Sequence, residues 1–180
     1  MELRLKELNK KIIKELEKEL GRKNPMSLPK ITRVVLNSGI GKYKDDKNLL
    51  ESIQKDLTLI SGQKPVLRHA KKSISNFKVR EGEPIGISVT LRGDRMWQFM
   101  DKFFNVVLPR VRDFRGLSPK SFDGNGNYTV GLKEHAVFPE INPNTMDKVK
   151  SLEVTFVTST RIDKEGRMLL EKLGMPFAKE

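Results

Sequence analysis

The chain has 180 residues, with 35 Lys or Arg against 23 Asp or Glu, and a formal net charge of +12 at pH 7. This positive charge points to a polyanionic partner, most simply RNA or DNA, with an anionic membrane surface as the competing partner. No segment is apolar for long enough to span a bilayer, and the N-terminus lacks the apolar core of a secretory signal. We therefore expect a cytoplasmic protein without a membrane partner, folded as one domain over residues 1–180.

Apolar periodicity and turn residues predict the elements in chain order. An amphipathic helix over residues 3–20 is followed by a strand over 31–40 and a helix over 46–60. A short extended stretch at 65–70 leads into a basic loop at 71–83, which returns to the clearest strand, 85–92. The remaining elements are a helix over 94–108 that Pro109 perturbs, a loop-rich insertion at 113–147 with a hairpin at 121–132, a strand at 152–160 and a helix at 163–173.

Three of these strands alternate apolar and polar residues, which predicts one buried face. We expect that face to pack against the helices at 46–60 and 94–108. Its expected core residues are Val34, Leu36, Ile87, Val89, Val154 and Phe156, with Ile85 and Leu91 on the same side. The Phe-rich run at 99–104 and Trp97 are also expected in the core. The first helix carries Lys10, Lys11, Lys14 and Lys18, and both a solvated face and a binding role remain open for it.

The most basic stretch of the chain is residues 61–80, with six Lys or Arg and no Asp or Glu. Its cations alternate with Ser, Asn and Gln, a mixture suited to phosphates, sugars and base edges. A solvated basic loop without a partner is the alternative interpretation. Because Ser73, Ser75 and Asn76 are too polar to anchor the loop by burial, we expect the loop at 71–83 to protrude and to be mobile.

The expected non-core faces of the strands carry short polar residues and glycines in place of long Lys and Glu side chains. They include Asn37, Gly39, Gly86, Ser88, Thr90, Arg92, Thr155 and Ser159. Such a low face suits hydrogen bonding to riboses and bases, although Ser and Thr are also tolerated on any exposed strand. The lack of aromatic residues argues against base stacking on this face.

The sequence gives little support for catalysis, and we expect no enzyme, cofactor or metal. The run Gly39-Ile-Gly41-Lys42 lacks the spacing of a phosphate loop. The chain has no cysteine, and its two histidines lie far apart, so a zinc site is not expected. The pairs Asp45 and Asp46, and Glu81 and Glu83, are interpreted as solvated.

Several motifs together resemble the fifth universal protein of the large ribosomal subunit, the 5S-rRNA-binding family, in its bacterial form. The clearest are residues 57–65 (Leu-Thr-Leu-Ile-Ser-Gly-Gln-Lys-Pro) and 70–75 (Ala-Lys-Lys-Ser-Ile-Ser). The similarity continues in the same order through 77–82, Gly86, 89–92, 109–117, 121–128 and 138–141. It covers nearly the whole chain.

The resemblance implies an α+β fold in which helices pack on one face of an antiparallel-rich, curved sheet and the open polar face binds RNA. It implies a non-catalytic protein of the central protuberance that contacts 5S rRNA, 23S rRNA, P-site tRNA and other central-protuberance proteins. Loops at 110–116 and 133–148 would meet a small-subunit head protein at an intersubunit bridge. A free-standing RNA-binding module and a nucleic-acid enzyme are the competing functional classes.

Three of the RNA-contact positions of that family match Asn37, Gln63 and Thr90. With the basic stretch and the polar strand faces, they define two expected groups of contacts. The expected rRNA contacts are Asn37, Gly39, Gln63, Lys64, Arg68, Ser88, Thr90 and Arg92. The expected tRNA contacts are Lys71, Lys72, Ser75, Asn76, Lys78 and Arg80.

Overall fold

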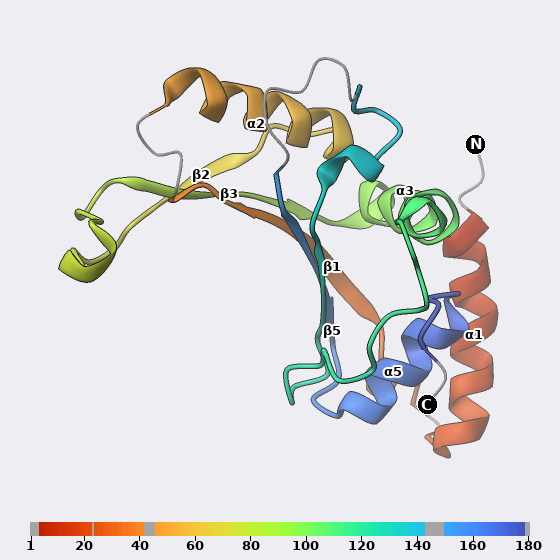
Figure 1. Cartoon of the computed structure of the whole chain (residues 1–180). Helices are drawn as coiled ribbons and strands as arrows, with labels where there is room; N and C mark the ends of the chain where they lie inside the picture. Colours follow the sequence, from red (N-terminus) through yellow and green to blue (C-terminus); the bar gives the residue numbers. More distant parts are fainter. Residues whose placement is uncertain (1–3, 23, 42–45, 143–149, 179–180) are drawn as a thin grey trace. The chain divides into compact units, whose positions relative to one another are not determined.

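The computed structural model describes residues 4–22, 24–41, 46–142 and 150–178 (Figure 1). It confirms the predicted α+β fold with an antiparallel sheet. The five strands run in the order β2-β3-β1-β5-β4. Their bounds are β1 Ile31–Gly39, β2 Val66–His69, β3 Pro84–Leu91, β4 Tyr128–Leu132 and β5 Leu152–Thr158. The α-helices are α1 Arg4–Leu20, α2 Lys47–Ser61, α3 Gly93–Lys102, α4 Leu108–Arg110 and α5 Asp163–Lys172.

The chain forms two compact units. The first comprises residues 1–34, 91–130 and 155–180, and the second comprises residues 35–90 and 131–154. The first unit therefore contains α1, α3, α4 and α5, and the second contains α2 and β2.

The core of the first unit is built from helices and aromatic rings. The α1 helix contacts both α3 and α5 through a stripe that includes Leu5, Ile12 and Leu16. Phe156 of β5 is fully buried, and its ring centroid lies 5.8 Å from that of Phe103 and 5.7 Å from that of Phe104. The buried Phe-rich run confirms the prediction for residues 99–104.

The helix after β3 accommodates Pro109 by forming a wider, π-helical turn just before it. Proline has no N–H to donate, so a regular α-helix would lose a hydrogen bond there. Residues 103–107 instead form a π-helical turn, in which the N–H of Leu108 donates to the carbonyl of Phe103. The helical path therefore continues to Arg110, beyond the predicted end at residue 108.

The predicted hairpin at 121–132 is shorter than expected. Its arms meet at a single bridge between Phe122 and Tyr128, and β4 then pairs with β5. The carboxylate of Asp123 accepts hydrogen bonds from the side-chain and backbone N–H groups of Asn127, which lower the pKa of Asp123. A Cβ on Gly126, where φ is 75°, would lie 2.6 Å from the carbonyl oxygen of Thr160. Close packing therefore requires this glycine.

In the second unit, α2 has a cap at each end. The carboxylate of Asp46 accepts from the N–H of Leu49 at 3.1 Å, and Gly62 ends the helix with φ 69°. The buried face of α2 contains Leu49, Ile53, Leu57 and Ile60. These are the apolar positions that predicted the helix.

The strand alternation is confirmed at all six expected core residues, each of which is at most 2% exposed. Ile85 differs from the prediction, because 38% of it is exposed. It lies at the start of β3, where the pairing with β2 shifts register between Arg68 and His69, and the buried run begins only at Gly86.

Replacing Phe156 by Ala should lower the free energy of unfolding by about 3–5 kcal/mol, because a fully buried ring is removed from a packed aromatic cluster. Denaturant unfolding would measure this loss. Phe77→Ala is the matched control, since Phe77 is 75% exposed, and it should change the same quantity by less than about 0.5 kcal/mol. A loss below about 1 kcal/mol for Phe156→Ala would contradict the assigned core.

Candidate nucleic-acid interface

Residues from three neighbouring strands meet around Gly86. A Cβ placed on this glycine would lie 3.6 Å from Oδ1 of Asn37 on β1 and 3.9 Å from Cβ of Arg68 on β2. Gly86 is itself buried and lies between the side chains of Asn37 and Arg68. We call Asn37, Gln63, Arg68, Gly86 and Thr90 the polar face.

Arg68 covers Ser88. The two strands pair so that Arg68 is opposite Gly86 and Val66 is opposite Ser88. Nε of Arg68 donates a 2.8 Å hydrogen bond to Oγ of Ser88, which is only 6% exposed. Arg68 itself is exposed. Ser88, expected as an RNA contact, is thus placed to hold Arg68 in position.

The turn after α2 brings Gln63 against β3. Oγ of Ser61 donates to the carbonyl of Leu57 at 2.6 Å, and the left-handed Gly62 reverses the chain. Nε2 of Gln63 then donates to the carbonyl of Thr90 at 3.2 Å. Gln63 and Thr90 are both half-buried, and Lys64 beside them is exposed. Two of the expected contacts are therefore adjacent.

An acidic residue borders the polar face. Nδ2 of Asn37 donates to Oε2 of Glu153 on β5 at 3.2 Å. Gly39 is exposed at the end of β1. Arg92 is exposed in the first unit, at the start of α3.

Two hydroxyls expected on the non-core strand faces make hydrogen bonds within the first unit. Oγ1 of Thr155 lies 3.1 Å from Oγ1 of Thr129, and Oγ of Ser159 accepts from the N–H of Lys30 at 3.0 Å.

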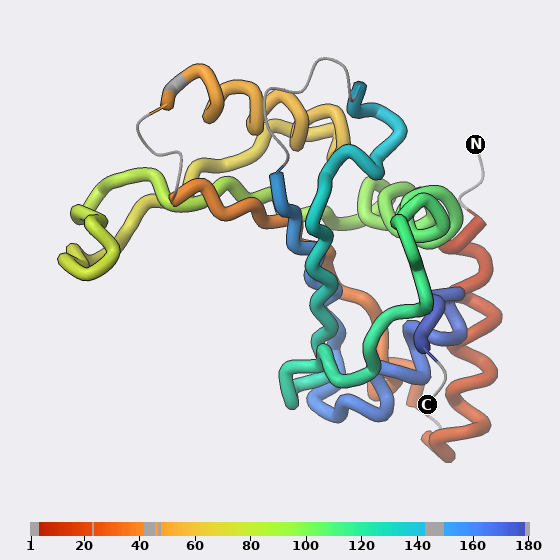
Figure 2. Tube along the Cα trace, viewed as in Figure 1, coloured from red at the N-terminus to blue at the C-terminus, as the bar shows by residue number. Residues whose placement is uncertain are grey.

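The basic loop, residues 71–83, extends past the ends of β2 and β3 (Figure 2). Its expected contact residues Lys71, Lys72, Ser75, Asn76, Lys78 and Arg80 are all exposed. Internal hydrogen bonds close the loop: the N–H of Glu81 donates to Oγ of Ser73 at 2.9 Å, and the N–H of Arg80 donates to Oε2 of Glu83 at 3.0 Å. At its base, the N–H of Gly82 donates to the carbonyl of Ala70 at 3.0 Å. The expected mobility of the loop stays a prediction.

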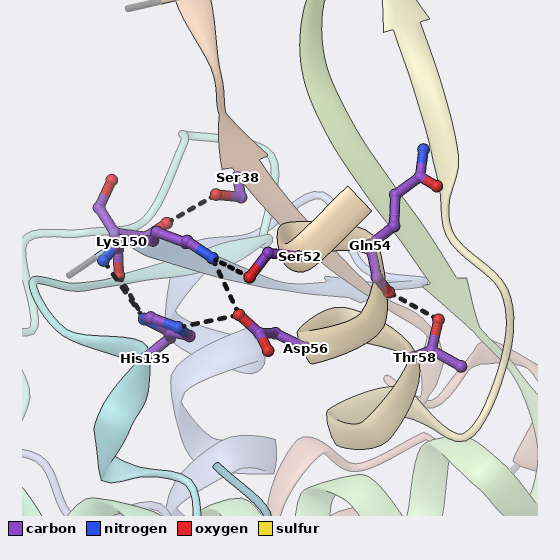
Figure 3. A network of polar contacts seen from close by, with 8 residues as sticks. Ser38, Ser52, Gln54, Asp56, Thr58, His135 and Lys150 are labelled. Carbon is purple, nitrogen blue, oxygen red and sulfur yellow. Dashed lines mark hydrogen bonds and ion pairs between the residues drawn. The ribbon is translucent and has the colours of Figure 1, made fainter. Parts of the chain in front are cut away.

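A buried polar network joins α2 to both ends of the segment between His135 and Lys150 (Figure 3). It was not predicted from the sequence. Nζ of Lys150 lies 3.0 Å from Oδ2 of Asp56 on α2 and 3.1 Å from Oγ of Ser52. Nε2 of His135 lies 3.3 Å from the same carboxylate oxygen. The backbone N–H of His135 also donates to the carbonyl of Lys150 at 3.0 Å. Both ends of the segment between His135 and Lys150 are thus fastened to one residue of α2. We call Asp56, His135 and Lys150 the Asp56 network.

The protonation of His135 fits this network. Nδ1 of His135 faces the backbone of Lys150, 3.3 Å from its N–H and 3.2 Å from its carbonyl oxygen, and Nε2 faces the carboxylate of Asp56. Burial lowers the pKa of His135, and this effect outweighs the opposing attraction of Asp56. Below the ordinary histidine pKa of 6.5, the unfolded chain takes up the proton more readily than the folded one, so acid weakens the fold here.

A metal-binding cluster and a membrane-spanning helix are both absent from the described residues. Within them, no group of three or more His, Asp or Glu side chains is arranged to hold a metal ion. In the same part of the chain, no helix has the length and apolarity needed to cross a membrane. Asp46 caps α2, whereas Asp45, the other member of the expected acidic pair, lies outside the described residues.

Two family models match the chain. The model described as ribosomal protein L5 matches residues 24–80, and the one described as the ribosomal L5P family C-terminus matches residues 84–177. The large ribosomal subunit protein uL5 of Desulfatibacillum aliphaticivorans is 56% identical over 165 residues, which is 92% of each chain. That of Thermoanaerobacter sp. (strain X514) is 53% identical over 170 residues, or 94% of this chain and 95% of the relative. That of Anaeromyxobacter sp. (strain Fw109-5) is 51% identical over 178 residues, or 98% and 99%.

Replacing Asp56 by Ala should lower the free energy of unfolding by about 3 kcal/mol, because it leaves the ammonium group of Lys150 buried without its carboxylate. The side chain of Lys150 is only 5% exposed. Lys6→Ala breaks the exposed ion pair with Asp94 and should cost less than about 1 kcal/mol. Equal losses for the two variants in denaturant unfolding would show that the Asp56 network stabilises the fold no more than an exposed ion pair does.

Proposed function

Since the chain belongs to the uL5 family of large-subunit ribosomal proteins, we propose that it binds 5S rRNA through the polar face and P-site tRNA through the basic loop. It is a structural component of the large ribosomal subunit and not an enzyme. Family membership also favours this role over a free-standing RNA-binding module. The observation that carries the proposal is that polar side chains from two strands, Asn37 and the exposed Arg68, flank the buried Gly86.

The polar face supports 5S rRNA binding through its donors. Because Gly86 is buried, the contacts to RNA would come from the polar side chains around it. Asn37 and Gln63 supply amide groups, and Arg68, held by Ser88, supplies a positioned guanidinium. Such a guanidinium can bind a phosphate through two parallel hydrogen bonds. Glu153 beside Asn37 would repel phosphates, so the RNA should lie toward β3 and β2.

The basic loop supports a separate contact. Its four exposed cations lie within ten residues, and the hydrogen bonds at its base keep the chain in a hairpin beyond the strands. Contacts to phosphates would let one loop accept tRNAs of many sequences.

Other partners would use the remaining surface. We assign 23S rRNA and other central-protuberance proteins as partners of the same chain. The loop at 110–116 carries exposed Arg110, Arg112 and Arg115 and would face a small-subunit head protein at an intersubunit bridge. The second expected bridge loop, 133–148, would be positioned by the Asp56 network, although its residues 143–148 lie outside the described ones.

Replacing Asn37, Gln63 or Arg68 by Ala should each weaken binding to 5S rRNA by about 1–3 kcal/mol, since a polar group of the RNA loses its partner. Gly86→Ala should weaken binding as well, because its methyl group would lie 3.6 Å from Oδ1 of Asn37 and 3.9 Å from Cβ of Arg68 and so restrict the positions of both side chains. Filter binding at fixed salt would measure the affinity. Lys164→Ala, which removes an exposed charge on α5, is the control and should leave it unchanged. Wild-type affinity in all four polar-face variants, with intact folds, would disprove the assignment.

Changing Lys71 and Lys72 together to Gln should weaken P-site tRNA binding for all tRNAs and reduce the salt dependence by about one unit per lost phosphate contact. Ribosomes carrying the variant would be tested for tRNA dissociation over a salt series. Affinity for isolated 5S rRNA should stay the same. Loss of 5S rRNA, or poor incorporation into large subunits, would instead place the loop in the anchoring surface.

A further inference from the structure

The tip of the basic loop exposes an aromatic ring. Phe77 is 75% exposed and Ile74, three residues earlier, is 48% exposed. A single exposed apolar side chain needs no explanation by itself. The backbone around Phe77 and the charge around it, however, both point to a ligand.

The backbone holds Phe77 at the turn. Ile74 and Val79 exchange two backbone hydrogen bonds, at 2.9 and 3.2 Å, and so close the tip. Residues Ser75–Phe77 form one 3-10 turn, and Lys78 ends it with φ 51°, where its N–H donates to the carbonyl of Ser75 at 2.9 Å. A lysine rarely adopts this left-handed conformation, and such strain is kept where the neighbouring structure imposes it. The ring is therefore presented by a defined turn.

The charges near the ring select the kind of partner. Lys71, Lys72, Lys78 and Arg80 lie within six residues of Phe77 and are all exposed. The loop has two acidic residues, Glu81 and Glu83. Glu83 accepts a hydrogen bond from the backbone of Arg80 inside the loop. An aromatic face among cations matches single-stranded nucleic acid, in which phosphates meet the cations and a base stacks on the ring.

We propose that Phe77 stacks on an unpaired base of the tRNA that the basic loop meets. The proposal rests on the tRNA contact proposed above and extends it from phosphates to a base. Stacking is compatible with tRNAs of many sequences, because every base has a π-face. It also gives the loop an attraction that salt does not screen, in contrast to the lysine contacts.

The test compares Phe77→Ala, Phe77→Leu and Phe77→Trp with the Lys71→Gln, Lys72→Gln double variant in ribosomes that hold deacylated tRNA in the P site. Phe77→Ala should raise the tRNA dissociation constant by about five- to a hundredfold, with an unchanged salt slope. Phe77→Trp should retain wild-type affinity for the tRNA. Phe77→Leu should lose most of the affinity that Phe77→Ala loses. Because Phe77 is exposed, all three variants should unfold like the wild type.

The outcomes separate this proposal from the one it rests on. If the lysine variant weakens tRNA binding and Phe77→Ala does not, the tRNA contact stands and the stacking is overturned. If Phe77→Leu binds like the wild type, apolar packing replaces stacking and the proposal is also overturned. If no variant affects tRNA, both proposals fail. If Phe77→Ala instead weakens only 5S rRNA or small-subunit binding, the ring serves another partner and the proposal is wrong.

Discussion

The two-residue alternation of the strands is the constraint on which the core and the polar face both depend. Leu36 is fully buried, and the next residue along β1, Asn37, faces the opposite side. Val89 and Thr90 divide β3 in the same way. A register slip of one residue would bury the amide and expose the leucine, at a cost that no polar contact would recover. Packing of the apolar core therefore decides which polar groups an RNA can reach.

The same alternation explains how much could be predicted from the sequence. It identified the six core residues of the strands and the side of the sheet that carries Asn37, whereas helical periodicity identified the main helices. The Asp56 network was not predicted from the sequence, although the spacing of the apolar residues contains a signal for it. Asp56 follows Ile53 by three residues on α2, and Lys150 lies two residues before Leu152, the buried first residue of β5. Neither residue alone reveals a partner 94 residues away. The hydrogen bond from Arg68 to Oγ of Ser88 could not be predicted either, because it depends on the β2–β3 register.

The two RNA contacts proposed for the second unit differ in kind. The polar face relies mainly on neutral groups held in fixed positions, and its cation, Arg68, is oriented by a hydroxyl at 2.8 Å. Hydrogen bonds from the neutral groups discriminate by geometry, and on this face the Arg68 contact to a phosphate should carry the dependence on ionic strength. The basic loop relies on several exposed ammonium groups, whose attraction reaches about 8 Å at physiological salt. A permanent partner suits the first kind of contact, and a partner that must leave suits the second.

The Asp56 network has a consequence for chain length. Because the backbone N–H of His135 bonds to the carbonyl of Lys150, the ends of the intervening segment are held together independently of what lies between them. For a loop closed in this way, doubling the number of residues costs only about 0.6 kcal/mol in closure entropy. Phe138 and Ile141 of this segment are buried, so a change of length that keeps both of them in place should leave the sheet and α2 undisturbed. Such a change would alter how far the segment reaches while the contact between His135 and Lys150 keeps its two ends together.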